Sequence, residues 1–238
     1  MVDPIRAMRM FGLSEGRKFS SKVKYIYMKQ LEEADFILIN KIDILEEDQL
    51  QQLKEKLETE YPEKTIFSCS ARNNIRLEGV FERLLEEEKS YGQAMEIDYQ
   101  TYGEGEALLG WLNASIELKS NAEIDGNDIL KSVAKGIQSE LEANESEIAH
   151  LKMTLAPNGL SGDIAVLNLV RNDMIAEESQ SLDDPLSSGE LIVNLRAEAD
   201  PEILKQALED VIEISSELNL IHLDYFKPGF PIPVHRDA

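Results

Sequence analysis

A short, fully apolar run places the strongest constraint on the fold of the first part of this chain. Phe36–Ile39 are four consecutive apolar residues, bounded by Asp35 and Asn40. Such a run is typical of a strand that is buried on both faces, as in a parallel sheet. Thr65–Cys69 is predicted to form a second short strand, in which Cys69 is a small core residue.

Predicted helices alternate with these strands. Leu50, Leu53 and Leu57 share one face of a predicted helix over residues 46–61, and a further helix is predicted over 75–88. The side chains expected to point inward from that second helix are Val80, Phe81, Leu84 and Leu85. A strand–helix–strand–helix order with short links predicts an α/β half-domain with parallel strands and a right-handed crossover.

The second part of the chain has a different pattern. Its predicted strands cover residues 109–118, 147–155, 164–170, 191–195 and 220–226. Asp125 and Asp200 are suited to cap the two predicted helices, and residues 172–189 are polar and predicted to form a mobile loop. The resulting β-α-β-β-β-α-β order predicts an α+β ferredoxin-like domain with one extra strand.

Charge separates the two parts further. Residues 1–100 carry 15 basic and 20 acidic side chains, whereas residues 101–238 carry 9 and 26. Such a shift indicates two units with different surfaces. We predict a first domain over 1–90, a linker over 91–107 and a second domain over 108–238.

The composition of the whole chain limits its partners and its location. A net charge of −22 repels nucleic acid and anionic membrane over most of the surface. The sequence contains no apolar run long enough to span a bilayer and no signal-peptide pattern at its start. Its single cysteine excludes an internal disulfide framework and a multi-cysteine metal site. We therefore predict a cytoplasmic protein that binds neither nucleic acid nor membrane.

Polar side chains follow both predicted strands of the first part. Asn40, Lys41 and Asp43 come directly after the first strand, and Ser70-Ala71-Arg72 lies at the matching end of the second. In an open α/β sheet, ligands bind beyond the carboxyl ends of the strands. A carboxylate such as that of Asp43 can accept hydrogen bonds from the N1–H and the exocyclic amine of guanine, a donor pair that adenine lacks.

The neighbouring residues can complete such a site. The aliphatic stem of Lys41 can lie along the base, and Asn40 can brace the neighbouring loops. A backbone N–H at Ala71 or Arg72 can reach O6 of guanine. We predict a guanine-binding site without catalytic residues or metal ligands, formed by Asn40, Lys41, Asp43, Ser70, Ala71 and Arg72. The alternative is a polar turn in which Asp43 caps the next helix.

Several segments carry a resemblance to a known family. They are residues 2–4, 29–35, 40–43 and 68–71 in the first part, and 99–113 and 226–236 in the second. In these segments the chain resembles the CobW-type GTPases of the CobW/HypB/UreG group. The resemblance implies a P-loop NTPase fold, binding of GTP with Mg²⁺ and slow GTP hydrolysis. It also implies delivery of zinc or cobalt, or assembly of a metallocofactor as in cobalamin biosynthesis.

Two motifs of that family are missing from the sequence. No Gly-x-x-x-x-Gly-Lys-Ser/Thr loop, which would hold phosphates and Mg²⁺, occurs in it. The Cys-x-Cys-Cys metal motif expected of the family is absent too, and Met1-Val2 resembles the remnant of a strand. We expect a chain that keeps guanine recognition and does not hydrolyse GTP alone. Its expected partners are the missing N-terminal GTPase half or a second subunit, and a metalloprotein client.

Two other functions remain open. The chain can be a non-catalytic protein-interaction module derived from a CobW-type GTPase, with Trp111 as an anchor between domains. It can also handle metal through carboxylates and histidines, since His222 and Asp224 share one strand face. For that pair, an ordinary surface hydrogen bond is the preferred interpretation.

Overall fold

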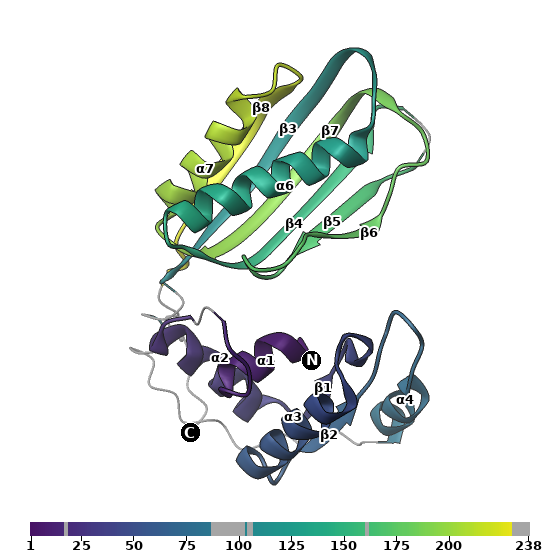
Figure 1. Cartoon of the computed structure of the whole chain (residues 1–238), viewed down its shortest axis with the longest axis vertical. Coiled ribbons are helices and arrows are strands. Elements are labelled where there is room, and N and C mark those ends of the chain that lie inside the picture. Colours follow the sequence, from purple (N-terminus) through teal and green to yellow (C-terminus); the bar gives the residue numbers. More distant parts are fainter. Residues whose placement is uncertain (17–18, 87–102, 104–106, 160–161, 230–238) are drawn as a thin grey trace. The chain divides into compact units, whose positions relative to one another are not determined.

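The computed structural model describes residues 1–16, 19–86, 103, 107–159 and 162–229. The chain divides into two compact units, Met1–Tyr102 and Gly103–Ala238 (Figure 1). Most of the predicted linker 91–107 lies outside the described residues, as does the part of the 226–236 segment beyond Gly229. Within the described residues, no helix combines the length and the apolar character needed to cross a membrane.

The first unit is a small α/β structure. Its elements are α1 (Pro4–Met10), α2 (Ser21–Glu33), β1 (Phe36–Ile39), the 3-10 helix η1 (Ile42–Ile44), α3 (Glu47–Glu60), β2 (Thr65–Ser68) and α4 (Leu77–Glu86). β1 and β2 pair in parallel, with Leu38 opposite Phe67, as predicted. Val2 forms a parallel bridge with Ile39, through hydrogen bonds on the side of β1 that faces away from β2.

One face of this parallel pair is covered by helices. Ile37 and Ile39 are fully buried and belong to one core cluster with Leu53 and Leu57 of α3 and Met8 of α1. Alternation along β1 directs Phe36 and Leu38 to the opposite face, where they are partly exposed. Helices therefore cover one side of the sheet more completely than the other.

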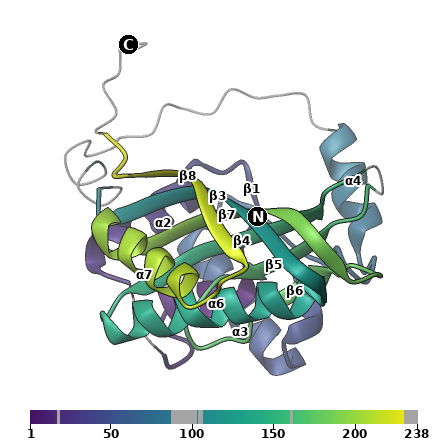
Figure 2. The same cartoon turned by 90° about the horizontal axis from the view of Figure 1, so that it is seen from above.

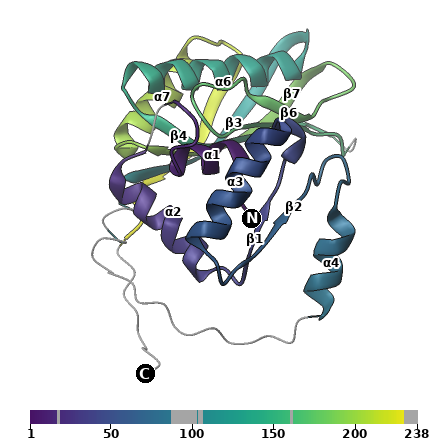
Figure 3. The same cartoon turned by 60° about the horizontal axis from the view of Figure 1, so that its bottom comes forward.

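The prediction for the helix after β2 is wrong in part. Val80 is buried, but Phe81, Leu84 and Leu85 are 57%, 50% and 87% exposed. Figures 1 and 3 show β1 and β2 between α3 and α4. The periodicity identified an amphipathic helix correctly, but the described elements leave most of its apolar face in solvent.

The second unit is an α+β sandwich. Its elements are β3 (Leu109–Ile124), α6 (Gly126–Ala143), β4 (Glu147–Pro157), β5 (Ala165–Leu169), β6 (Glu177–Gln180), β7 (Leu186–Glu198), α7 (Pro201–Glu213) and β8 (Leu218–Phe226). The six strands lie in the order β6-β5-β4-β7-β3-β8, with every pairing antiparallel. Four strands and both helices follow the predicted ferredoxin-like β-α-β-β-α-β order, and β5 and β6 extend the sheet.

Both helices of this unit lie on the same side of the sheet (Figure 2). Their starting points follow the predicted caps: the Asp125 carboxylate accepts hydrogen bonds from the N–H groups of Asn127 and Asp128, and that of Asp200 accepts one from Glu202. Alternate strand residues such as Leu112 and Ile116 are buried in one core with α6 and α7.

The prediction of a mobile loop over 172–189 is wrong, because β6 and the start of β7 lie within it. Side chains distant in sequence hold this segment. The Asn172 amide accepts from Ile148 N (2.8 Å) and donates to Ser146 O (2.7 Å). Gln138 of α6 donates to the carbonyls of Asn172 and Met174.

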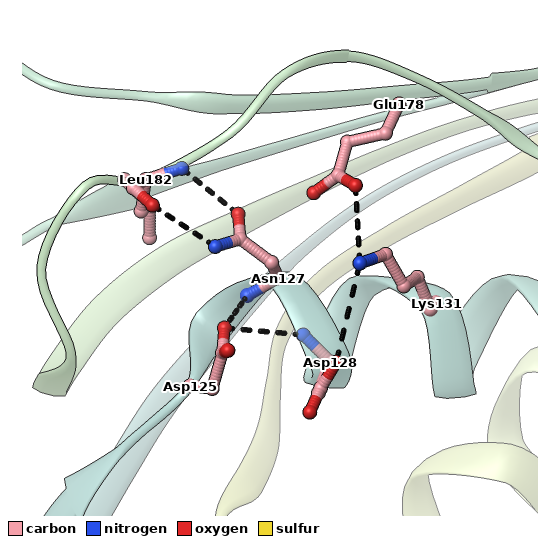
Figure 4. Close-up of polar contacts among 6 residues, drawn as sticks. All are labelled: Asp125, Asn127, Asp128, Lys131, Glu178 and Leu182. Atoms are coloured by element: carbon pink, nitrogen blue, oxygen red, sulfur yellow. Dashed lines mark hydrogen bonds and ion pairs between the residues drawn. The ribbon is translucent and has the colours of Figure 1, made fainter.

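The start of α6 makes further contacts with the segment between β6 and β7 (Figure 4). The Asn127 side chain forms two hydrogen bonds with the backbone N–H and carbonyl of Leu182, at 2.8 and 3.0 Å. One turn later, Lys131 Nζ lies 3.0 Å from Glu178 Oε2. These contacts connect the polar strand β6 to a helix on the core side of the sheet.

Candidate guanine-binding site

The first loop of the candidate site begins where β1 ends. Lys41 adopts a left-handed backbone conformation (φ 61°, ψ 38°), which turns the chain from the strand into η1, the element that contains Asp43. The ammonium group of Lys41 lies 3.3 Å from Asp3 Oδ2. Asp3 also caps α1, because its carboxylate accepts a hydrogen bond from Arg6 N at 3.0 Å. The loop is thus tied to the segment beside β1.

The second loop follows β2 and is closed by Ser70. The backbone groups of Ser70 and Ile75 exchange two hydrogen bonds, at 3.1 and 3.0 Å. Ser70 is fully buried, and its hydroxyl accepts a hydrogen bond from Asn73 N at 3.2 Å. The turn between these residues exposes Ala71 and Arg72.

Asn40 joins the two loops. Its Oδ1 accepts hydrogen bonds from Ala71 N at 3.0 Å and from Cys69 Sγ at 3.6 Å. The backbone N–H of Ile42 adds a hydrogen bond to Cys69 O at 3.2 Å. The structure therefore brings the two predicted segments together. It also directs the Ala71 N–H, one of the two groups considered for O6 of guanine, to Asn40.

Asp43 lies exposed at this edge, and its side chain makes no hydrogen bond or ion pair among the residues that the structure describes. The alternative prediction, that Asp43 caps the next helix, is wrong. Glu46 is the N-cap of α3 and forms a capping box with Gln49, whose Oε1 accepts from Glu46 N at 3.1 Å. Because no described residue pairs with the Asp43 carboxylate, this group is available to a ligand.

Cys69 adds no reactive thiolate to this site. Burial raises the pKa of the Cys69 thiol, which favours the uncharged form over the nucleophilic thiolate. Among the described residues, no group of three or more His, Cys, Asp or Glu side chains is arranged to hold a metal ion. His222 and Asp224 form an exposed hydrogen-bonded pair, with 2.8 Å between Nε2 and Oδ2.

Sequence reasoning missed the contribution of Asp3 to this region. Its position before Pro4 is a recognisable helix start, because proline is favoured at the first helical position. The ion pair with Lys41, however, joins residues far apart in sequence, and no local pattern indicates it.

Comparisons with known proteins agree with the resemblance for the first unit. Residues 1–68 match the family model of the CobW/HypB/UreG nucleotide-binding domain. This match includes β1, β2, Asn40, Lys41 and Asp43, and it ends before the Ser70 loop.

Among solved structures, the zinc-bound YjiA GTPase from E. coli is 16% identical, and a zinc-bound triple mutant of the YjiA GTPase is 14% identical. Each comparison has a TM-score of 0.28 and covers 88% of this chain. The chain spans 59% of the length of each of these structures. A comparison with curated proteins finds no match.

Proposed function

We propose that this chain supplies the guanine-recognition part of a CobW-type GTP-binding protein that delivers a metal such as zinc or cobalt to a metalloprotein client. One observation carries the proposal. The Asp43 carboxylate is exposed, has no partner within the described chain, and lies beyond β1 in a loop that Asn40 ties to the loop after β2.

Guanine recognition follows from the chemistry of these groups. The two oxygens of Asp43 accept from the N1–H and the exocyclic amine of the base, while the stem of Lys41 lies along the base plane. Asn40 acts as a positioning residue, because its hydrogen bond to Ala71 N joins the loop after β2 to the loop that carries Asp43. Adenine presents no donor pair to the carboxylate, and a hydrogen bond to a charged group contributes about 1.5–3 kcal/mol, or roughly tenfold to a hundredfold in affinity.

Binding of the phosphates requires groups from elsewhere. Because the sequence lacks a phosphate-binding loop, we place that loop, and the Mg²⁺ that neutralises the phosphates when GTP is bound, outside residues 1–238, on the N-terminal GTPase half or on a second subunit. GTP hydrolysis is then a property of the combined protein.

Two apolar surfaces support a partner of this kind. Parallel sheets are normally covered on both faces, whereas Phe36 and Leu38 are only partly covered. Phe81, Leu84 and Leu85 of α4 are at least half exposed, and exposed apolar patches mark interaction sites. We infer that the partner packs against these surfaces.

A nucleotide titration of the full chain tests the proposal without the partner. GMP, AMP and XMP each carry one phosphate, so a difference between them reports the base. We expect GMP to shift the NMR signals of residues 40–43 and 71–72 with an affinity at least about tenfold above that of AMP. Equal shifts with AMP and GMP, or no shifts in these residues, contradict the assignment.

Two variants sharpen this test. Asp43→Asn replaces an acceptor by a donor, so it should weaken GMP binding and favour XMP, which presents a carbonyl in place of the amine. Asp48→Asn makes the same chemical change in the first turn of α3 and should leave the preference for GMP unchanged.

A second candidate function is a non-catalytic interaction module derived from such a GTPase. The second unit has an extensive core of its own, and both of its helices lie on one face of its sheet. The other face of the sheet favours this function, because a protein partner can bind there. This function predicts binding of a protein partner by the full chain with no preference among the three nucleotides.

A further inference from the structure

Among the described residues of the second unit, both helices lie on one face of the sheet and none lies on the other. Along β3, Leu112, Ala114 and Ile116 are buried beneath α6 and α7, whereas Trp111 and Asn113 lie on the opposite face. We call this second surface the open face. Figures 1 and 2 show both helices of the unit on the other side of the sheet.

Aromatic and cationic side chains gather on the open face. Strand register places Trp111 of β3 between Arg196 of β7 and Phe226 of β8. The guanidinium carbon of Arg196 lies 3.6 Å from the centroid of the Trp111 ring, and the Trp111 and Phe226 ring centroids are 5.8 Å apart. This stack presents one planar cation beside two partly exposed rings.

A second cation lies next to this stack. Lys152 of β4 pairs with Asn194, two residues before Arg196 on β7, so Lys152 and Arg196 are diagonal neighbours on the same face. Diagonal neighbours in an antiparallel pair are about 7–8 Å apart. Both side chains are exposed.

Lys152 and Arg196 have no carboxylate partner among the described residues, which is unexpected in so acidic a chain. Carboxylates outnumber basic side chains 46 to 24, and most other cations among the described residues of the unit form ion pairs. The paired cations are Lys119, Lys131, Arg171, Lys205 and Lys227, whereas Lys135 contacts the side-chain amide of Gln138. Within the described chain, by contrast, neither Lys152 nor Arg196 forms an ion pair, and the shielded indole N–H of Trp111 has no acceptor.

We propose that the open face binds an acidic, partly apolar peptide segment of a partner protein. Carboxylates contact Arg196 and Lys152, and an apolar side chain packs on Trp111 and Phe226. Side chains two residues apart in an extended peptide point the same way at about 6.8 Å, close to the spacing of the two cations. The unit is otherwise strongly acidic, so an acidic peptide is attracted here and repelled by the flanking surface.

The same acidity argues against a nucleic acid on this surface. Aromatic and basic side chains on a sheet also suit single-stranded RNA. A polynucleotide, however, carries a charge at every phosphate, and residues 101–238 contain 26 acidic against 9 basic side chains. A short peptide needs only two favourable contacts and avoids most of that repulsion.

Fluorescence anisotropy on the full chain tests this inference. The probe is a labelled peptide with the repeat Glu-Ser-Glu-Ser-Leu-Ser, whose glutamate and leucine side chains all point the same way in an extended conformation. The comparison probes are the same peptide with lysine in place of glutamate, and oligouridylate. We expect the acidic peptide alone to bind, with an affinity that falls as salt is added. Lys152→Gln and Arg196→Gln should each weaken it about tenfold, the loss of one charge-assisted hydrogen bond.

A charge-matched control separates the patch from net charge. Lys205→Gln removes one positive charge from α7 on the helix side of the sheet, and it should change the affinity by less than about twofold. Equal weakening by Lys205→Gln, unchanged binding in both patch variants, or no binding of the acidic peptide overturns the inference. Binding of oligouridylate in its place assigns the face to nucleic acid. Asp43→Asn should leave peptide binding intact, so this result stands apart from the guanine titration.

Discussion

At the scale of single residues, Asn40 determines how the candidate site is assembled. The positions of the site segments were predictable, because the carboxyl ends of parallel strands meet at one edge of a sheet. The hydrogen bond from Ala71 N to Asn40 Oδ1 was not, since it joins residues 31 positions apart. The same holds for the Lys41–Asp3 ion pair, which depends on a left-handed residue that the sequence does not mark.

Replacing Asn40 tests this link. Asn40→Ala leaves the Ala71 N–H without its acceptor and should lower the free energy of unfolding of the first unit by about 1 kcal/mol. Urea denaturation followed by far-UV circular dichroism measures the change. Asn73→Ala, an exposed side chain in the same loop, serves as the control and should have almost no effect. Equal effects of the two variants contradict a bracing role.

Asn172 is a second residue whose importance local sequence did not indicate. It is buried, and its amide satisfies both the Ile148 N–H and the Ser146 carbonyl. Asn172→Ala leaves two backbone groups without partners and should destabilise the second unit by about 3 kcal/mol. The comparison is Asn168→Ala, which removes one exposed hydrogen bond to Ser179, and its expected cost is below about 1 kcal/mol. Urea midpoints followed by Trp111 fluorescence distinguish the two outcomes.

At the scale of elements, the hydrophobic pattern of the sequence predicted the strands that bury one face and missed the strand that buries neither face. Alternation predicted β4 and β7, and the cap residues Asp125 and Asp200 predicted the starts of α6 and α7. β6 was missed because Glu177–Gln180 is a polar strand at the edge of the sheet, with no buried side chain to produce a period. Its position depends instead on side chains of α6.

Packing of α6 against α7 depends on a glycine. A Cβ atom at Gly136 would lie 2.6 Å from Val211 Cγ2, and a β-branched side chain cannot easily move away. Gly136→Ala should therefore destabilise the second unit by about 1–3 kcal/mol, despite the better helix propensity of alanine. In Gly136→Ala/Val211→Ala the clash is removed, and part of the loss should be regained.

Gly79 in α4 is the matched control for this substitution. A Cβ atom there meets no other atom within 4 Å, so Gly79→Ala should stabilise α4 by up to about 1 kcal/mol. Thermal unfolding of the three variants measures these effects. A stabilising Gly136→Ala would show that the two helices can separate enough to accept a methyl group.

At the scale of the whole molecule, the two units contain separate cores with different chemistry. The first buries phenol groups: burial, with smaller effects of Glu32 and Glu60, raises the pKa of Tyr61 to about 12. Burial is also the main cause that raises the pKa of Tyr27. The described part of the second unit has an exposed tyrosine, Tyr225, on the edge strand β8.

This difference predicts that alkaline pH unfolds the first unit before the second. Unfolded tyrosines lose their protons near pH 10, whereas the folded first unit retains them, so unfolding releases protons above that pH. The stability of this unit should be complete below about pH 10 and should fall between about pH 10 and about pH 12.

Urea titrations at about pH 9 and about pH 11 provide the measurement, with far-UV circular dichroism following both units and the single tryptophan, Trp111, following the second. At the higher pH, circular dichroism should show the first unit unfolding at a lower urea concentration than the second, and Trp111 fluorescence should not show this early transition. The reason is that Tyr27 and Tyr61, whose phenols stay protonated only in the folded state, both lie in the first unit. The Tyr27→Phe/Tyr61→Phe variant keeps both rings and removes both protons, so most of this early shift should disappear. A single transition seen by both probes, moving equally with pH, would instead mean that the two cores unfold as one.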